Sequence, residues 1–212
     1  MIYLAYGDCS LLLKSENFSR FFENLSPVAR VRVQEPARAQ YRAYRLMEHL
    51  MLEAFCKKGL CAISPEEIRI AEQGKPYFEN GPAFSISHDK YLVAIALTND
   101  FQSIGVDIQS QPNPVTASRV RRRFLTPLPP YRKGAPEVNF MMAHVENEGI
   151  DLTPAHPFGT PSTFLCDYVR AEAVMKYSGG GFADFPHLHS LCEECETAVL
   201  PLGETAIALA YG

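Results

Sequence analysis

The chain has 212 residues, with 24 acidic and 20 basic side chains and a formal net charge of −4. At about 100–200 residues per domain, this length fits one domain, or two small ones built on a common plan. Hydrophobic residues make up 47% and charged residues 21%, a balance typical of folded globular proteins that argues against wholesale disorder. No apolar run reaches the roughly 18–20 residues of a membrane helix, and the mild acidity argues against a dedicated nucleic-acid binder.

The N-terminus and the cysteines indicate a cellular compartment. The first residues carry no basic leader and reach an acid at Asp8, which is unlike a signal peptide. Six cysteines in a chain of this length, without such a leader, are expected to be mostly reduced thiols. We therefore expect a cytoplasmic protein, acting as a monomer, with no membrane and no nucleic-acid partner.

The first half of the chain is predicted to combine helices with short strands. A short helix is expected over 15–22, with Ser15 as its N-cap. A long helix is expected from Glu35-Pro36 to Gly59, since Pro favours the first helical position and Gly the end. Its apolar residues recur at helical spacing and form a buried face: Tyr44, Met47, Met51 and Phe55. The expected strands cover residues 2–6, 68–70, 84–88, 91–97 and 104–108.

The second half begins with a predicted helix over 115–125, which carries four arginines at 119 and 121–123. Residues 126–163 are rich in Pro and Gly and predict a long loop or partly ordered lid. A helix over 162–177, stopped by glycines 179–181, precedes strands at 196–200 and 205–211. The pattern predicts an α+β fold of two halves, 1–103 and 104–212, each a small antiparallel sheet packed on a long helix.

Three sequence islands stand out, in a fixed order. The first joins Gly74-Lys75-Pro76 to Ser87-His88, the second is Ile104-Gly105-Val106-Asp107-Ile108-Gln109, and the third runs from Tyr168 to Lys176. In this order they resemble the Sfp-type 4′-phosphopantetheinyl transferases, which show a G-K-P turn, an S-H pair, a G-D strand end and a W-x-x-K-E-A-x-x-K helix. The resemblance extends from the long first helix to the last strand.

The resemblance implies a function and a fold. Such enzymes move the phosphopantetheine arm of coenzyme A onto a serine of an acyl or peptidyl carrier protein and release 3′,5′-ADP, in fatty acid, polyketide or nonribosomal peptide biosynthesis. Because the reacting centre is a diphosphate, the protein must position the groups, neutralise phosphate charge and help deprotonate the serine. The implied fold has pseudo-twofold symmetry, with coenzyme A in the cleft between the halves.

The resemblance assigns the catalytic and metal-binding roles to the second half. Asp107, otherwise a turn-capping residue, becomes a Mg²⁺ ligand, and Gln109 offers a neutral oxygen to the same ion. Glu172 and Lys176 share one helix face and, taken alone, form an exposed ion pair. Under the resemblance Glu172 becomes a metal ligand and candidate general base, while Lys176 contacts a coenzyme A phosphate.

Coenzyme A is expected to contact residues of the first half. Lys75 and Pro76 in the turn and Ser87-His88 at the strand end match family positions near its phosphates; alternatively, Lys75 is a solvated turn lysine and His88 a structural histidine. Arg38, Arg42 and Arg45 lie on one helix face and either bind phosphate or form a solvated basic stripe. The arginines at 119–123 either face the acidic carrier or are simply exposed.

The chain departs from the family pattern at three positions. Gln109 stands where many relatives have an acid, Ala171 where they have a lysine, and Tyr168 where they have Trp. We interpret Tyr168 as a core aromatic. The other two changes motivate a second hypothesis, a catalytically weak or inactive relative that binds coenzyme A or a carrier without turnover.

One cluster lies outside the pattern. Two histidines and a C-x-x-C could supply four zinc ligands, or could be unrelated histidines and reduced thiols before a strand: His187, His189, Cys192 and Cys195.

Overall fold

The computed structural model describes residues 1–111, 137–180 and 186–212. Within these ranges the helices are α1 (Ser15–Phe22), α2 (Pro27–Gln34), α3 (Ala39–Lys57), α5 (Thr163–Ser178) and α6 (Leu188–Glu194), with 3-10 turns at Ser10–Leu13 and Pro65–Glu67. The strands are β1 (Ile2–Asp8), β2 (Arg69–Ile70), β3 (Pro76–Tyr77), β4 (Ala83–Asp89), β5 (Leu92–Thr98), β6 (Ile104–Ser110), β7 (Val138–Glu146), β8 (Gly149–Pro154), β9 (Glu196–Leu202) and β10 (Thr205–Tyr211). The chain is therefore α+β, as predicted. Every described helix is too short or too polar to serve as a membrane-spanning segment.

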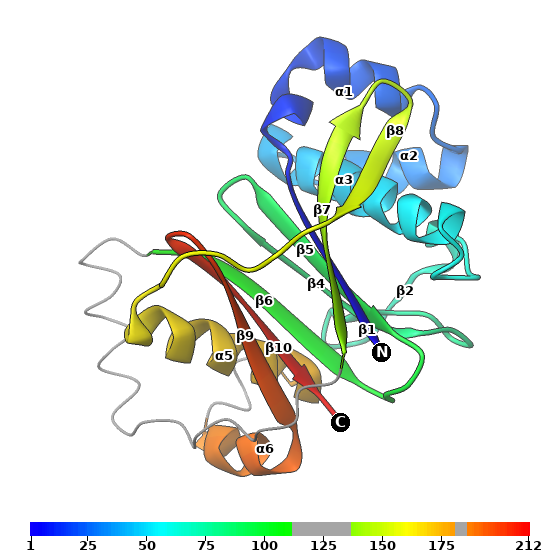
Figure 1. Ribbon diagram of the computed structural model, residues 1–212. Coiled ribbons are helices and arrows are strands. Elements are labelled where there is room, and N and C mark those ends of the chain that lie inside the picture. The colour runs from blue at the N-terminus through cyan, green and yellow to red at the C-terminus, as the bar shows by residue number, and fades with distance from the viewer. Residues whose placement is uncertain (112–136, 181–185) are drawn as a thin grey trace.

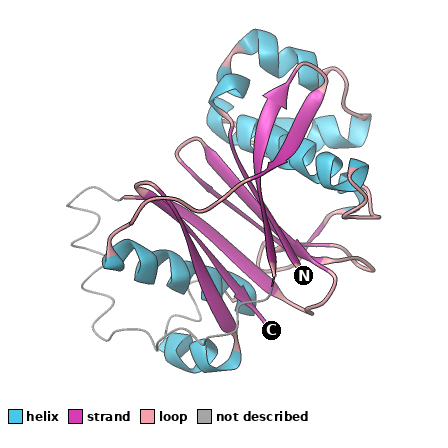
Figure 2. Cartoon of the chain, viewed as in Figure 1, coloured by secondary structure: helices cyan, strands magenta, loops and turns pink. Residues whose placement is uncertain are grey.

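The elements form four layers (Figure 1). A five-stranded sheet in the order β4-β5-β1-β7-β8 carries α1 to α3 on its outer side, and a three-stranded sheet in the order β6-β10-β9 carries α5 and α6. Figure 2 shows the strands between the two sets of helices. Most strand pairs are antiparallel, but β1 and β7 run parallel. The two β-sheets pack against each other, so the order of layers is helix, sheet, sheet, helix.

Alternation along the strands produces this layering. On β5, Val93, Ile95 and Leu97 face the helical core around α3, whereas Ala94 and Ala96 face the core between the sheets. On β10 the alanines face α5 and the larger residues face the other sheet. Since both faces of these strands are buried, their sequences are continuous apolar runs without polar alternation.

The two sheets also meet along one edge, where β4 lies beside β6. Side chains on β4 accept hydrogen bonds from backbone N–H groups of β6: Ser85 from Val106 (3.1 Å), Ser87 from Ile108 (3.3 Å) and Asp89 from Ser110 (2.7 Å). Alternate side chains of one strand thus satisfy the N–H groups that a neighbouring backbone would otherwise bond. We call this arrangement the β4–β6 seam.

Most predicted elements are confirmed within a few residues. The expected buried face of α3 is at most 4% exposed, and Gly59 and Gly179 have the left-handed backbone expected after a helix. The Ser15 cap is wrong, because Lys14 is the N-cap residue and no side chain caps the helix. The long helix starts at Ala39 rather than Glu35, because α2 occupies the residues before it.

The largest error concerns the expected loop at 126–163. Residues 138–154 form the β7–β8 hairpin, which extends the first sheet through six parallel Cα pairs between β7 and β1. The hairpin brings Met141, Ala143 and Leu152 into the core around α3. The two sheets therefore do not coincide with the predicted halves 1–103 and 104–212, because β7 and β8 belong to the same sheet as β1, β4 and β5. The helix expected at 115–125, its arginines and residues 126–136 lie outside the described residues.

Candidate active site

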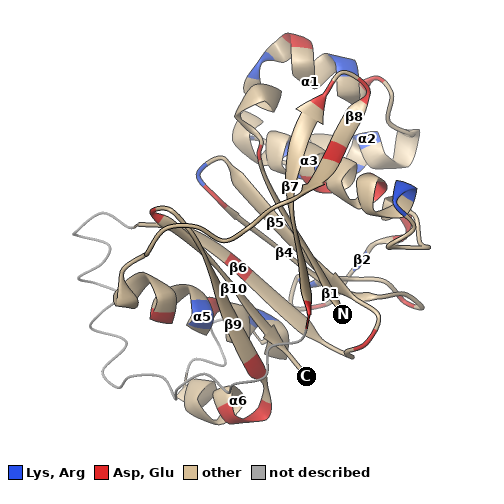
Figure 3. Cartoon of the chain, in the orientation of Figure 1, with Lys and Arg blue, Asp and Glu red and all other residues tan. Residues whose placement is uncertain are grey.

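Close packing of α5 on β6 creates the site. A Cβ added to Gly105 would lie 2.0 Å from the carbonyl oxygen of Ala173 and 2.5 Å from the backbone nitrogen of Tyr177, so only glycine allows this approach. Asp107 and Gln109 follow at intervals of two residues and therefore share the strand face of Gly105. Tyr168, Glu172 and Lys176 follow one another at intervals of four on α5. Figure 3 shows an acidic residue on β6 and residues of both charges on α5.

Asp107 is the centre of this site. Its side chain is 7% exposed, and its Oδ1 accepts hydrogen bonds from Lys176 Nζ (2.7 Å) and Ser87 Oγ (2.7 Å). Lys176 Nζ also donates to Ser87 Oγ at 2.7 Å. The other carboxylate oxygen, Oδ2, is buried without a hydrogen-bond partner among the described residues. A buried carboxylate oxygen without a partner carries a desolvation cost, so it is available to a ligand.

Ser87 belongs to the seam. Its hydroxyl donates to Asp107 and accepts from Lys176 and from the backbone N–H of Ile108, which uses its full hydrogen-bonding capacity. The residue is 4% exposed. The structure therefore places the Ser87 side chain against the aspartate, where it orients the carboxylate.

Glu172 is half-buried beside Asp107. Burial raises the pKa of Glu172 to about 7, and the negative charge of Asp107 adds to the effect, while Lys176 and a hydrogen bond from Tyr168 oppose it. A carboxyl group with a pKa near neutrality can exchange a proton at neutral pH.

Tyr168 interacts with the two acidic residues of the site, which the sequence analysis did not expect. Burial raises the pKa of its phenol to about 12, with further contributions from Glu172 and Asp107, and the phenol hydrogen-bonds the Glu172 carboxylate. The interpretation of Tyr168 as a plain core aromatic is therefore wrong. Its spacing of four residues from Glu172 on a predicted helix was the available signal.

A cavity of about 230 Å³ opens beside β6 and α5. Its lining joins the turn before β3, strand β4 and the end of α5: Gln73, Gly74, Lys75, Pro76, Ser85, Ile86, Met175, Lys176 and Gly179. Lys75 Nζ donates to the carbonyl oxygen of Tyr177 at 3.2 Å and to Ser103 Oγ at 3.4 Å. Burial lowers the pKa of Lys75. Two lysines, separated by a hundred residues in sequence, thus line one cavity.

His88 lies at the exposed end of β4. Its ring stacks on Tyr44 at 4.4 Å between centroids, with Tyr41 at 6.2 Å edge-on. Desolvation lowers the pKa of His88, and the charges of Glu48, Lys176 and Arg45 act on it as well. His88 is thus positioned between α3 and α5, outside the lining of the cavity.

The three arginines of the expected stripe have different surroundings. Arg45 pairs with the buried Glu48 at 3.0 Å, Arg42 is half-buried, and Arg38 is exposed at the N-cap of α3. None of them is among the described residues that line the cavity. Within the described part of the chain, Arg38 and Arg42 form no ion pair, which leaves two cationic groups on this face of α3.

The donor set suits a hard cation. Among the described residues no group of three or more His, Cys, Asp or Glu side chains could hold a metal ion. Mg²⁺ is commonly bound by one or two carboxylates completed by water and substrate phosphates. The free Oδ2 of Asp107, the neighbouring Glu172 carboxylate and the half-buried Gln109 amide fit that requirement.

The structure also bears on two other sequence observations. Ala171 is 0% exposed in the core between α5 and the small sheet, so this position faces away from solvent.

In the C-terminal cluster His187 and His189 are exposed, whereas Cys192 and Cys195 are buried, and α6 occupies 188–194 where no helix was predicted. The four side chains do not form a metal-binding group among the described residues.

No family model matches the chain, and no curated protein matches it either.

Proposed function

We propose that this chain is a Mg²⁺-dependent 4′-phosphopantetheinyl transferase that uses coenzyme A and modifies a serine of an acyl or peptidyl carrier protein. The observation that carries the proposal is the meeting of Asp107 and Glu172 beside a cavity lined by Lys75 and Lys176. Two lysines that line one cavity, with two acidic groups beside it, suit a substrate that is a polyanion and requires a divalent cation.

The proposed fold is that of the family, with two α+β halves related by a pseudo-twofold axis. The packing of α3 on the large sheet and of α5 on the small one supports it. The β4–β6 seam would then lie where the halves meet, and Lys75 and Lys176 would both approach the diphosphate from the lining of the cavity.

The reaction would proceed by attack of the serine oxygen on the phosphorus that carries the pantetheine arm. A new phosphorus–oxygen bond forms, the bond to 3′,5′-ADP breaks, and the leaving oxygen keeps the electron pair. Glu172, with a pKa of about 7, would accept the serine proton directly or through water. Lys75 and Lys176 would neutralise charge on the phosphates. When bound by Asp107, Gln109 and Glu172, Mg²⁺ would supply further positive charge at the diphosphate.

Carrier modification and release of 3′,5′-ADP provide the direct test. Purified protein is incubated with coenzyme A, Mg²⁺ and a panel of carrier proteins lacking the arm, and the carrier mass is measured. We expect transfer by the wild type and by Glu148→Gln, an exposed control in the β7–β8 turn, and none by Glu172→Gln. If no carrier gains mass at high Mg²⁺, the enzymatic proposal fails.

A second candidate is a protein that binds coenzyme A without turnover. It is favoured by the pairing of Lys176 with Asp107 and by the neutral Gln109, both of which reduce the negative charge available to a metal. Calorimetry with coenzyme A, with and without Mg²⁺, separates the two: tight binding without carrier modification supports the second candidate.

A further inference from the structure

Two cysteines outside the proposed site lie side by side at the end of α3. Cys56 Sγ lies 3.2 Å and Cys61 Sγ 3.3 Å from the same acceptor, the carbonyl oxygen of Ile63, and both thiols donate to it. The two thiols are also close enough for Cys61 to be, after burial, the next cause of the raised pKa of Cys56. Two sulfurs that converge on one oxygen at these distances lie within the range from which a disulfide can form after rotations of their side chains.

The backbone at the end of the helix produces this convergence. After Lys57 the chain reverses at Gly59, whose φ is +72°. The N–H of Gly59 bonds the carbonyl of Cys56 at 2.9 Å, and the N–H of Leu60 bonds the carbonyl of Phe55 at 2.9 Å. These bonds fold the following residues back over the last turn of the helix. Cys61 therefore returns to the side of Cys56, although five positions separate them.

The two thiols differ in access. Cys56 is half-buried, whereas Cys61 is 5% exposed. An oxidant from solvent therefore reaches Cys56 first, and Cys61 is positioned to react with the product. Burial raises the pKa of the Cys56 thiol to about 12, with Cys61 as the next cause, so the reactive thiolate is scarce and oxidation is slow.

We propose that Cys56 and Cys61 form an oxidisable dithiol, which a peroxide converts into an intramolecular disulfide. Cys56 loses its proton to water, and its sulfur attacks one oxygen of the peroxide. The O–O bond breaks and Cys56 becomes a sulfenic acid. When the oxidant is hydrogen peroxide, the other oxygen leaves as water after it takes up a proton. The Cys61 sulfur then attacks the Cys56 sulfur. The S–S bond forms, the S–O bond breaks, and the hydroxyl leaves with the Cys61 proton as a second water. The dithiol loses two electrons and the peroxide gains two.

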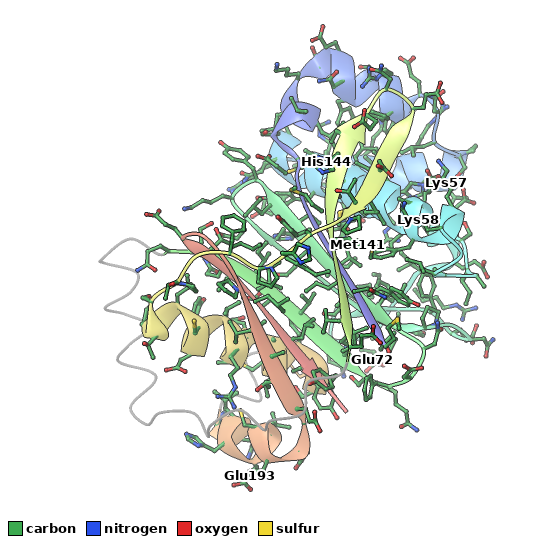
Figure 4. All side chains as sticks on the ribbon, in the orientation of Figure 1. Lys57, Lys58, Glu72, Met141, His144 and Glu193 are labelled. Carbon is green, nitrogen blue, oxygen red and sulfur yellow. The ribbon has the colours of Figure 1, made fainter. Side chains whose placement is uncertain are left out.

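The sequence allows a direct test, because Lys57 and Lys58 lie between the two cysteines at the end of α3 (Figure 4). Trypsin therefore separates residues 46–57 from residues 59–69, and a Cys56–Cys61 disulfide alone would hold those peptides together. The full chain is treated with hydrogen peroxide until free Cys56 is consumed, remaining thiols are alkylated, and the digest is analysed by mass spectrometry with and without reductant.

We expect most of the consumed Cys56 to be recovered in the linked peptide pair, which reductant separates. In Cys61→Ser the pair disappears and Cys56 is recovered as sulfinic acid or as a disulfide between two chains. Cys166, half-buried beside Asp167, provides an internal comparison and should oxidise to sulfinic acid in the wild type. Recovery of wild-type Cys56 as sulfinic acid, with Cys61 still open to alkylation, would overturn the proposal whether or not the variant folds.

Discussion

The Ser87 hydroxyl donates a hydrogen bond to Asp107 Oδ1 at 2.7 Å and accepts another from the backbone N–H of the residue that follows the aspartate, at 3.3 Å. One side chain of β4 therefore fixes both the backbone of β6 and the carboxylate that β6 carries. One of the bonds of the β4–β6 seam and the bond that orients the Asp107 carboxylate are thus made by the same oxygen atom, so stability and site geometry depend on it together.

Ser87→Ala should destabilise the protein by about 2 kcal/mol, because it leaves a buried N–H without its acceptor and removes one of the two donors to the buried Asp107 carboxylate. Ser85→Ala, a matched change on the same strand, removes the acceptor of one N–H, at 3.1 Å, and should cost about 1 kcal/mol. Urea denaturation of both variants measures the difference. Equal losses would mean that the bond to Asp107 contributes no net stability.

Gly105→Ala should destabilise the protein by about 3 kcal/mol or more, because the new methyl group would overlap backbone atoms of α5. Gly59→Ala is the control, since it meets no atom within 4 Å and suffers only from its left-handed backbone, at a cost of about 1 kcal/mol. Thermal unfolding of the two variants tests the prediction, and a smaller loss for Gly105→Ala would show that α5 can move away from β6.

Glu172 should make stability depend on pH in the direction opposite to that of an acid whose pKa is lowered on folding by a salt bridge. Its pKa is raised from 4.5 to about 7 on folding, so the folded state binds the proton more tightly than the unfolded state. The contribution to stability is fully present below pH 4.5 and is lost as the pH rises through about 7, amounting to at most about 3 kcal/mol.

Metal-free urea denaturation of the wild type and of Glu172→Gln at pH 5 and pH 8 measures this contribution. The variant should gain stability relative to the wild type at pH 8 and much less at pH 5. The exposed control Glu148→Gln should show no such difference. An identical pH dependence in the wild type and Glu172→Gln would contradict the raised pKa.

Lys75→Ala should weaken binding of coenzyme A by about tenfold or more, because it removes a charge-assisted hydrogen bond from the cavity. Lys58→Ala, which removes a lysine paired with Asp151 at the far end of α3, should leave the affinity unchanged. Calorimetric titration with coenzyme A compares them. Equal affinities in the two variants would remove Lys75 from the proposed phosphate site.

Much of the fold follows from local patterns in the sequence. The spacing of apolar residues predicted α3, the glycines at 179–181 predicted the end of α5, and the dense apolar run at 91–97 predicted β5. Helix α2 was missed although Ser26 caps it and Pro27 starts it, a recognised signal. The β7–β8 hairpin was missed because prolines and polar residues surround it, and its position is determined by pairing with β1, more than a hundred residues earlier. Met141 and His144 lie on β7 (Figure 4), where buried and exposed residues do not alternate regularly along the strand.

The site was predictable in part for the same reason. Helical spacing placed Glu172 and Lys176 on one face, and the resemblance to the transferase family grouped Gln109 with Asp107. The partner of each group depends on which strands lie side by side, so the seam and the role of Ser87 within it could not be read from spacing. Ala171 and Tyr168 show the same limit, since both were interpreted without knowing which face of α5 meets β6.

The position of β7 also determines how the chain can be divided. Since β1 lies between β5 and β7, a fragment ending at residue 111 would present one side of β1 as an unpaired edge, and such edges promote aggregation. A fragment beginning at residue 137 would carry the missing strand without the helices that cover it. Neither fragment should fold alone, but the two produced together should associate through β1 and β7, as a split protein reassembles from its pieces.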